Sequence, residues 1–170
     1  MLGVVLAGIL GLAALDIGYA QQPSVAPVPP LLNRAKSVFI SNAGSDSGLF
    51  PHPFSGDSDR GYNQFYAAVQ SMGRFNLVDN PADADLVLEL RLHAPSGPAN
   101  ADKSKGASDP LPMFRLVVWD RRTHYILWAV TESIGQANLQ KTHDRNFDDA
   151  LADLVQGLKK VTASSSAIKP

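Results

Sequence analysis

At 170 residues, the chain has room for a short leader and one domain of ordinary size, and its 45% hydrophobic content is typical of a globular protein. The net charge of −1 at pH 7 gives no basic or acidic excess, so the composition does not indicate a nucleic-acid partner. The chain has no cysteine, which excludes disulfides, thiolate metal sites, a cysteine nucleophile and a lipid-anchored cysteine.

The first twenty residues have the pattern of a secretory signal. Residues 2–15 are all apolar, Ala or Gly, a run about as long as a signal-peptide core and shorter than the roughly 20 residues of a membrane span. Gly18 and Ala20 are small residues of the kind that precede a cleavage position, so we expect a signal peptide over residues 1–20. No basic residue precedes the apolar run, and the alternative is an inner-membrane anchor formed by an uncleaved leader. We therefore expect a periplasmic or secreted protein that meets a membrane only through such a leader.

Proline marks the segment that follows the leader. Residues 21–34 contain four prolines and are expected to form an extended linker. We expect a single α/β domain over residues 35–161 and a flexible polar tail over residues 162–170.

Within the domain, the spacing of apolar residues changes between that of strands and that of helices. Alternation over residues 36–42 predicts a strand, and helical spacing over residues 62–72 predicts a helix that ends at Gly73. Residues 74–78 are interpreted as a short second strand. The clearest strand follows Asp85, where four leucines alternate with other residues: Leu86, Leu88, Leu90 and Leu92 against Val87, Glu89, Arg91 and His93. The Pro, Gly and Ser content of residues 95–110 indicates a surface insertion.

Two further strands are expected to form a hairpin. Residues 113–119 and 125–134 are rich in β-forming side chains, and the polar turn Asp120-Arg121-Arg122-Thr123 separates them. One register places apolar side chains opposite one another on both faces. Its pairs are Val118–Ile126, Leu116–Trp128, Phe114–Val130, Trp119–Tyr125 and Val117–Leu127.

An amphipathic helix over residues 147–161 is expected to end the domain. Asp148 and Asp149 lie in its first turn and Lys159 and Lys160 in its last, as the helix dipole favours. The order of elements predicts the α+β class, with a mainly antiparallel sheet of about five strands and two helices packed on one face.

The other face of that sheet is the expected functional surface. It is more apolar than a solvated sheet face, since it carries Phe39 and Val87 in addition to side chains of the hairpin. A contiguous apolar patch of this kind favours partner binding. The residues predicted to bind are Trp119, Tyr125, Val117, Leu127, Arg91 and Arg115.

The loop over residues 42–61 is the second candidate surface. Phe50 and Phe54 add apolar bulk to a stretch rich in Gly, Ser and Asp. Such aromatic residues either fold back over the core, which is the favoured interpretation, or bind a partner, so both residues are included in the predicted binding set.

Four short motifs carry a family resemblance. They are Phe75-Asn76-Leu77-Val78-Asp79, Ala82-Asp83-Ala84-Asp85-Leu86-Val87-Leu88, Val117-Val118-Trp119-Asp120 and Ile126-Leu127-Trp128. Over roughly residues 36–161 the chain resembles bacterial envelope proteins related to the N-terminal domain of TolB and to the curli-secretion protein. The resemblance implies an exported, non-enzymatic α/β module, often one that binds partners. The chain departs from the pattern because it lacks the lipid-anchored cysteine common among such proteins.

Catalytic and metal-binding motifs are weak. Gly56-Asp57-Ser58 is similar to the Gly-Asp-Ser motif of one esterase class, but the Asp-x-x-His pair that would activate the serine is missing, so capping of a helix is favoured. The four histidines, His52, His93, His124 and His143, have no ligand spacing. Arg121 and Arg122 could meet an anionic partner such as phosphate or lipid headgroups, although solvated arginines are the favoured interpretation. We expect no catalytic residue, no cofactor and no metal.

The leading hypothesis is a non-catalytic periplasmic interaction module whose partner is another envelope protein. The alternative is a small-molecule or lipid-binding carrier with a pocket between sheet and helices. A hydrolase is a third hypothesis, and it requires a base near Ser58.

Overall fold

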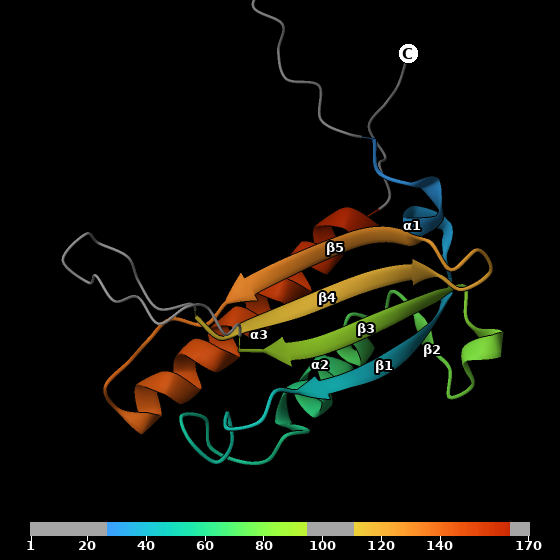
Figure 1. Ribbon diagram of the computed structural model, residues 1–170. Coiled ribbons are helices and arrows are strands. Elements are labelled where there is room, and N and C mark those ends of the chain that lie inside the picture. Colours follow the sequence, from blue (N-terminus) through green and yellow to red (C-terminus); the bar gives the residue numbers. More distant parts are fainter. Residues whose placement is uncertain (1–26, 95–110, 164–170) are drawn as a thin grey trace, which may run out of the picture.

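The computed structural model describes residues 27–94 and 111–163, in which five strands form one sheet with helices against one of its faces (Figure 1). The predicted signal peptide, the predicted insertion and nearly all of the predicted tail lie outside these residues. Within the two described ranges, no helix is both long and apolar enough to cross a membrane.

The sheet has the strand order β2-β1-β3-β4-β5. β1 pairs in parallel with both of its neighbours, whereas β3, β4 and β5 form an antiparallel meander. The α+β class with a five-stranded sheet is thus confirmed, and the sheet is mixed because α2 carries the chain back to the start of β1 before β2 begins. The strands are β1 (Ser37–Ser45), β2 (Asn76–Leu77), β3 (Leu86–His93), β4 (Met113–Asp120) and β5 (Ile126–Ser133).

Two helices, α2 (Arg60–Ser71) and α3 (Gln140–Thr162), cover one face of this sheet, as predicted (Figure 1). The core lies between them and the strands, where the leucines of β3 meet Phe65 of α2 and Phe147 of α3, all buried. A short 3-10 helix, η1 (Pro81–Asp83), connects β2 to β3.

A further helix, α1 (Pro30–Arg34), occupies the end of the predicted linker. Pro30 is tolerated because it stands in the first turn, where its missing N–H has no helical acceptor. Leu32 is 0% exposed and belongs to the core, and Arg74 donates hydrogen bonds to the carbonyls of Asn33 (2.6 Å) and Ala35 (2.9 Å). Residues 30–34 therefore belong to the folded domain and are not extended as predicted.

The hairpin forms, but its predicted register is wrong by two residues. Trp128 lies opposite Val118, not opposite Leu116. One residue of the shift comes from the turn, where the N–H of Asp120 bonds to the carbonyl of Tyr125 and His124 has a φ of 59°. The other comes from a β-bulge at Leu127, between the Trp119–Ile126 and Val118–Trp128 pairs.

The last helix begins earlier than the apolar spacing indicated. α3 starts at Gln140, so Asp148 and Asp149 stand in its third turn instead of its first. The seven residues before Phe147 carry no apolar stripe and are held by polar contacts, which periodicity cannot reveal.

Candidate partner-binding surface

An apolar row crosses the sheet face that no described helix covers. Strand pairing places Phe39 of β1 beside Val87 of β3, Val87 beside Trp119 of β4, and Trp119 beside Ile126 of β5. Val117, one pair further along β4, is buried on this same face without being part of the core beneath the sheet. Ile126 is 50% exposed, so the row reaches solvent at the β5 edge. A continuous apolar row on a bare sheet face is typical of a contact surface.

Trp119 stands beside a hollow of about 540 Å³. The hollow lies where η1 and the β4–β5 turn approach the open face. Its lining combines apolar and charged groups: Pro81, Ala82, Val87, Glu89, Trp119, Asp120, Arg121 and His124. The indole N–H of Trp119 is buried and finds no acceptor among the described residues. Because this nitrogen is buried, a partner can contact Trp119 only at the exposed part of its ring.

The other half of the open face is polar. Arg91 and Arg115 lie directly opposite one another on β3 and β4. Asp46, just after β1, accepts hydrogen bonds from Arg91 (2.8 Å) and from the backbone N–H of Ala94 (2.9 Å), and its other contact is His93 (2.6 Å). The hydrogen bond from Arg91, followed by that from Ala94, lowers the pKa of Asp46 to about 2. The carboxylate is thus already paired, and the surface here presents guanidinium groups.

Of the predicted residues on this face, Trp119, Val117, Arg91 and Arg115 lie where expected. Tyr125 and Leu127 do not, and this corrects the prediction. The bulge turns Leu127 toward the core, and Ile126 takes the place beside Trp119 that was assigned to Tyr125. Alternation along the strand then directs Tyr125 to the opposite side, where it is 73% exposed. Ile126 was missed because the sequence gives no signal for a bulge.

The Phe50 and Phe54 loop folds back, which confirms the favoured interpretation and removes these residues from the binding surface. Phe54 is only 1% exposed, and its ring centroid lies 5.1 Å from that of Phe147 in α3. Phe50 packs against both rings. Both aromatics serve the core on the helix side, away from the open face.

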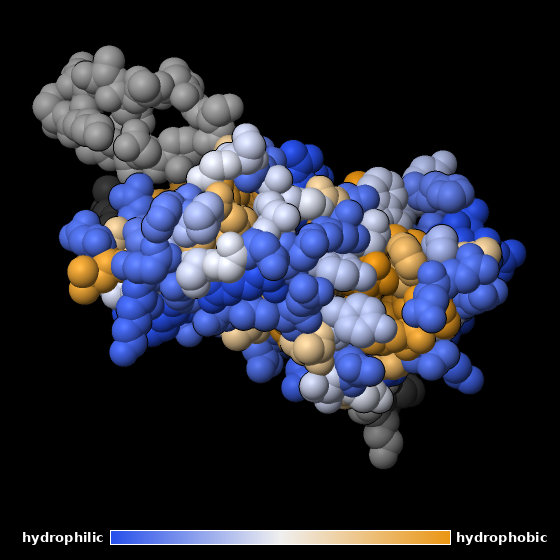
Figure 2. Space-filling model, turned by 90° about the horizontal axis from the view of Figure 1, so that it is seen from below, coloured by the Kyte–Doolittle hydropathy of each residue, from blue (hydrophilic) through white to orange (hydrophobic). Residues whose placement is uncertain are grey.

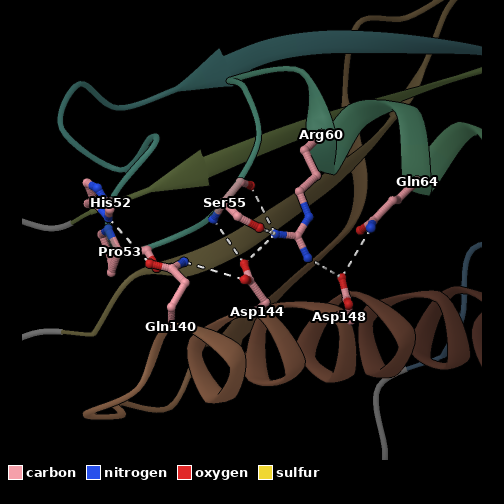
Figure 3. A network of polar contacts seen from close by, with 8 residues as sticks. All are labelled: His52, Pro53, Ser55, Arg60, Gln64, Gln140, Asp144 and Asp148. Carbon is pink, nitrogen blue, oxygen red and sulfur yellow. Dashed lines mark hydrogen bonds and ion pairs between the residues drawn. The ribbon is translucent and has the colours of Figure 1, made fainter.

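A polar network fixes this loop to α3 (Figure 3). Arg60, at the start of α2, reaches Asp144 at 2.6 Å and Asp148 at 2.8 Å, and Asp144 also accepts a hydrogen bond from the backbone N–H of Ser55. Gln140 donates to the carbonyl of Pro53 and thereby ties the first turn of α3 to the same loop. The network holds two helices and a loop together, and it is the structural reason why α3 starts early.

Burial alone would raise the pKa of Asp144, but the hydrogen bonds from Ser55 and Arg60 outweigh it and hold that pKa well below its usual range. Asp144 therefore stays ionised in the folded protein and keeps Arg60 in place. Its oxygens accept hydrogen bonds from Ser55, Arg60 and Gln140, so Asp144 connects the loop and α2 to α3.

The structure provides little for the two other hypotheses. Beneath the sheet, the hollow beside Phe114 and Gly61 has a volume of only about 10 Å³, too small for a ligand. Larger hollows on the helix side, of about 300 and 310 Å³, lie beside the loop before α3 and between α2 and α3. The carboxylates next to Ser58 serve the backbone and Asn42: Asp57 accepts from the N–H of Asp59, and Asp59 accepts from the amide of Asn42. Among residues 27–94 and 111–163, no cluster of three or more His, Asp or Glu side chains could hold a metal.

No family model matches the chain, and no curated protein matches it. Solved structures with a similar chain path include a variant of the PelC dodecamer from Paraburkholderia phytofirmans, at 12% identity and a TM-score of 0.47, covering 75% of this chain and 88% of that one. Protein XCC0632 from Xanthomonas campestris has 13% identity and a TM-score of 0.42, with 74% and 81% covered. The LpoB C-terminal domain from Salmonella enterica has 14% identity and a TM-score of 0.38, with 63% and 94% covered.

None of these three is a TolB or a curli-secretion protein, so the relationship to those families stays a resemblance of motifs. With identities this low, the function proposed below is drawn from the surface of this chain.

Proposed function

We propose that this protein is a non-catalytic binding module of the bacterial cell envelope, and that it holds a partner protein on the open face of its sheet with Trp119 at the centre. The observation that carries the proposal is the row Phe39, Val87, Trp119 and Ile126, which runs across four strands on the side without helices. The leader-like first twenty residues support the exported location.

The chemistry of the face indicates the kind of partner. Aromatic and aliphatic side chains next to a shallow hollow favour an apolar anchor from the partner, since such anchors supply most of the binding energy at protein interfaces. The guanidinium groups of Arg91 and Arg115 favour carbonyl or carboxylate oxygens around that anchor.

A partner pull-down from envelope extract tests the proposal. Trp119→Gln should reduce the recovered partner by more than tenfold, because a central aromatic anchor contributes about 2 kcal/mol or more. Thr131→Asn is the matched control, since Thr131 is exposed on the same face beside Arg115 but outside the apolar row. Circular dichroism verifies that both variants fold.

The absence of cysteine makes a second readout possible. A single cysteine introduced as Ala129→Cys on the open face, and carrying a cross-linker, should capture the same partner. The equivalent Gln156→Cys on the exposed side of α3 should not. Equal recovery with folded Trp119→Gln, or capture only from the helix side, would overturn the proposal.

A further inference from the structure

The end of the molecule formed by the β4–β5 turn carries exposed apolar residues next to cations. Tyr125 is 73% exposed and Ile126 is 50% exposed, and they point to opposite sides of the hairpin. Arg121 and Arg122 stand in the turn just before them. Exposed aromatic and aliphatic side chains beside arginines are the combination found where proteins enter the interfacial region of a bilayer.

The cation in this turn is available to an external anion. Asp120 could have neutralised Arg122, but its carboxylate accepts hydrogen bonds from the backbone N–H of Arg122 and from the hydroxyl of Thr123. The hydrogen bond from the Arg122 N–H, followed by that from the Thr123 hydroxyl, lowers the pKa of Asp120. Within the described residues the guanidinium of Arg122 forms no ion pair, and the turn is held in shape without it.

The charge of the described residues is polarised along the long axis. At the turn end, seven cations stand against four aspartates: Arg34, Lys36, Arg74, Arg121, Arg122, Lys159 and Lys160 against Asp79, Asp83, Asp85 and Asp120. At the opposite end, seven acids stand against five cations: Asp46, Asp57, Asp59, Glu132, Asp144, Asp148 and Asp149 against Arg60, Arg91, Arg115, Lys141 and Arg145. An anionic surface would therefore attract the turn end and repel the other.

Hydrophobic surface is also found on the β1 side of this half of the molecule. Figure 2 is seen from below, and its largest hydrophobic area lies toward the right, the half in which Figure 1 places β2 and η1. α1 lies there too, since Leu31 lines a hollow together with Arg121 and Arg122. The chain enters the fold through α1, at the end that carries the exposed pair.

We propose that the β4–β5 turn is a docking tip for an anionic phospholipid bilayer, in which Tyr125 and Ile126 enter the interfacial region and Arg122 binds lipid phosphate. This goes beyond the proposed protein-binding function and does not depend on it. Ile126 lies directly beside Trp119, so docking to lipid and binding of a partner protein would compete at this end of the open face.

The test uses the full chain and its lack of cysteine. An environment-sensitive dye is attached through Tyr125→Cys, and in a second chain through Ser47→Cys, which is exposed at the opposite end. With vesicles of phosphatidylcholine and phosphatidylglycerol, emission from position 125 should shift to the blue while emission from position 47 stays constant. With phosphatidylcholine alone the shift at position 125 should be much smaller. Because insertion of the apolar residues 2–15 would by itself bring the turn end near the bilayer, both dyes are also measured in chains that start at Gln21, where the difference should persist.

Charge variants in the dye-labelled chain supply the second measurement. Arg122→Gln should raise the half-saturating concentration of anionic lipid about fivefold, the effect of one cation near an anionic surface. Lys141→Gln, at the other end, is the matched control and should change it little. In unlabelled chains, Ile126→Ser should weaken vesicle binding on the order of tenfold.

Three outcomes would overturn the proposal. The dyes at positions 125 and 47 could respond alike, the response could be equal on neutral and anionic vesicles, or position 125 could respond only when an envelope protein is added. The last result would assign the tip to a protein partner instead of a lipid surface. None of these outcomes affects the Trp119 test, so the two proposals fail separately.

Discussion

Arg60, at the start of α2, contacts both the preceding loop and α3. Its guanidinium lies between Asp144 and Asp148 of α3, bonds to the carbonyl of Ser55, and stacks over the ring of Phe147 at 4.4 Å from the ring centroid. Its two carboxylate partners differ in exposure, with 22% for the Asp144 side chain and 51% for that of Asp148. Because ion pairs contribute more when they are shielded from water, these two contacts should differ in strength.

Asp144→Asn should lower the free energy of unfolding by about 2 kcal/mol, because it leaves the half-buried Arg60 without its main partner. Asp148→Asn removes an exposed contact of the same arginine and should cost less than about 1 kcal/mol. Urea unfolding of both variants measures the difference. Equal losses of unfolding free energy in the two variants would show that the more buried contact with Asp144 stabilises the fold no more than the exposed contact with Asp148.

Two carboxylates, those of Asp46 and Asp144, make the stability of the fold depend on pH in acid. Asp46 and Asp144 have pKa values below the ordinary 3.8 in the folded state, so unfolding takes up protons when the pH falls. Their contribution is complete above pH 3.8 and is lost as the pH falls toward about 2, the pKa of Asp46. Asp144→Asn should therefore flatten the decline of stability with acid relative to the unchanged chain.

At the scale of elements, two helical glycines have opposite surroundings. A Cβ at Gly61 in α2 would lie 3.0 Å from Cε1 of Phe114, whose ring is buried and packed at 4.8 Å from that of Phe147. A Cβ at Gly157 in α3 would meet Trp128 at 3.6 Å, an ordinary contact distance. Gly61 thus permits a close approach of helix to sheet, whereas Gly157 only weakens its helix.

Gly61→Ala should destabilise the protein by about 1 kcal/mol through overpacking. Gly157→Ala should stabilise it by about 0.5–1 kcal/mol, the usual gain of alanine over glycine within a helix. Thermal unfolding distinguishes the two signs. A stabilised Gly61→Ala would mean that Phe114 can move aside.

The elements themselves were largely predictable from the sequence. The leucine alternation identified β3, and helical spacing identified α2, because burial on one face leaves a direct periodic record. The first turns of α3, from Gln140 onward, show no apolar periodicity, because polar contacts with a loop distant in the sequence stabilise them. The bulge at Leu127 was not predictable from the spacing of apolar residues either. It moved Tyr125 off the open face and Ile126 onto it. Of the candidate surface, Trp119, Val117, Arg91 and Arg115 were predictable because they share the strand period with the leucines.

At the scale of the whole molecule, the domain begins before its first strand. α1 adds Leu32 to the core, and Arg74 closes the contact from the far end of α2. A domain that began at residue 35 would lack the buried side chain of Leu32 and the carbonyl of Asn33 that accepts a hydrogen bond from Arg74. The N-terminal segment is thus part of the stability of the fold.

Leu32→Ala should lower the free energy of unfolding by about 2–4 kcal/mol, the range for a leucine lost from a packed core. Leu31→Ala, a neighbour that is only half-buried, should cost distinctly less and is the control. Urea unfolding of the two variants measures both. A loss no larger at Leu32 than at Leu31 would place the domain boundary back at residue 35.

The interior position of β1, between β2 and β3, affects how the chain can fold if it is threaded through a translocon from its N-terminus. Asp85 accepts hydrogen bonds from the backbone N–H groups of Lys36 and Ser37, a separation of 48 residues for the second of them. β1 is therefore the first strand to emerge and must wait for β2 and β3 before it has any partner, while β3, β4 and β5 can pair as soon as each appears. Until then, the core-facing side chains Val38 and Ile40 of β1 stay uncovered, and an exported form of this protein would depend on periplasmic protection during that interval.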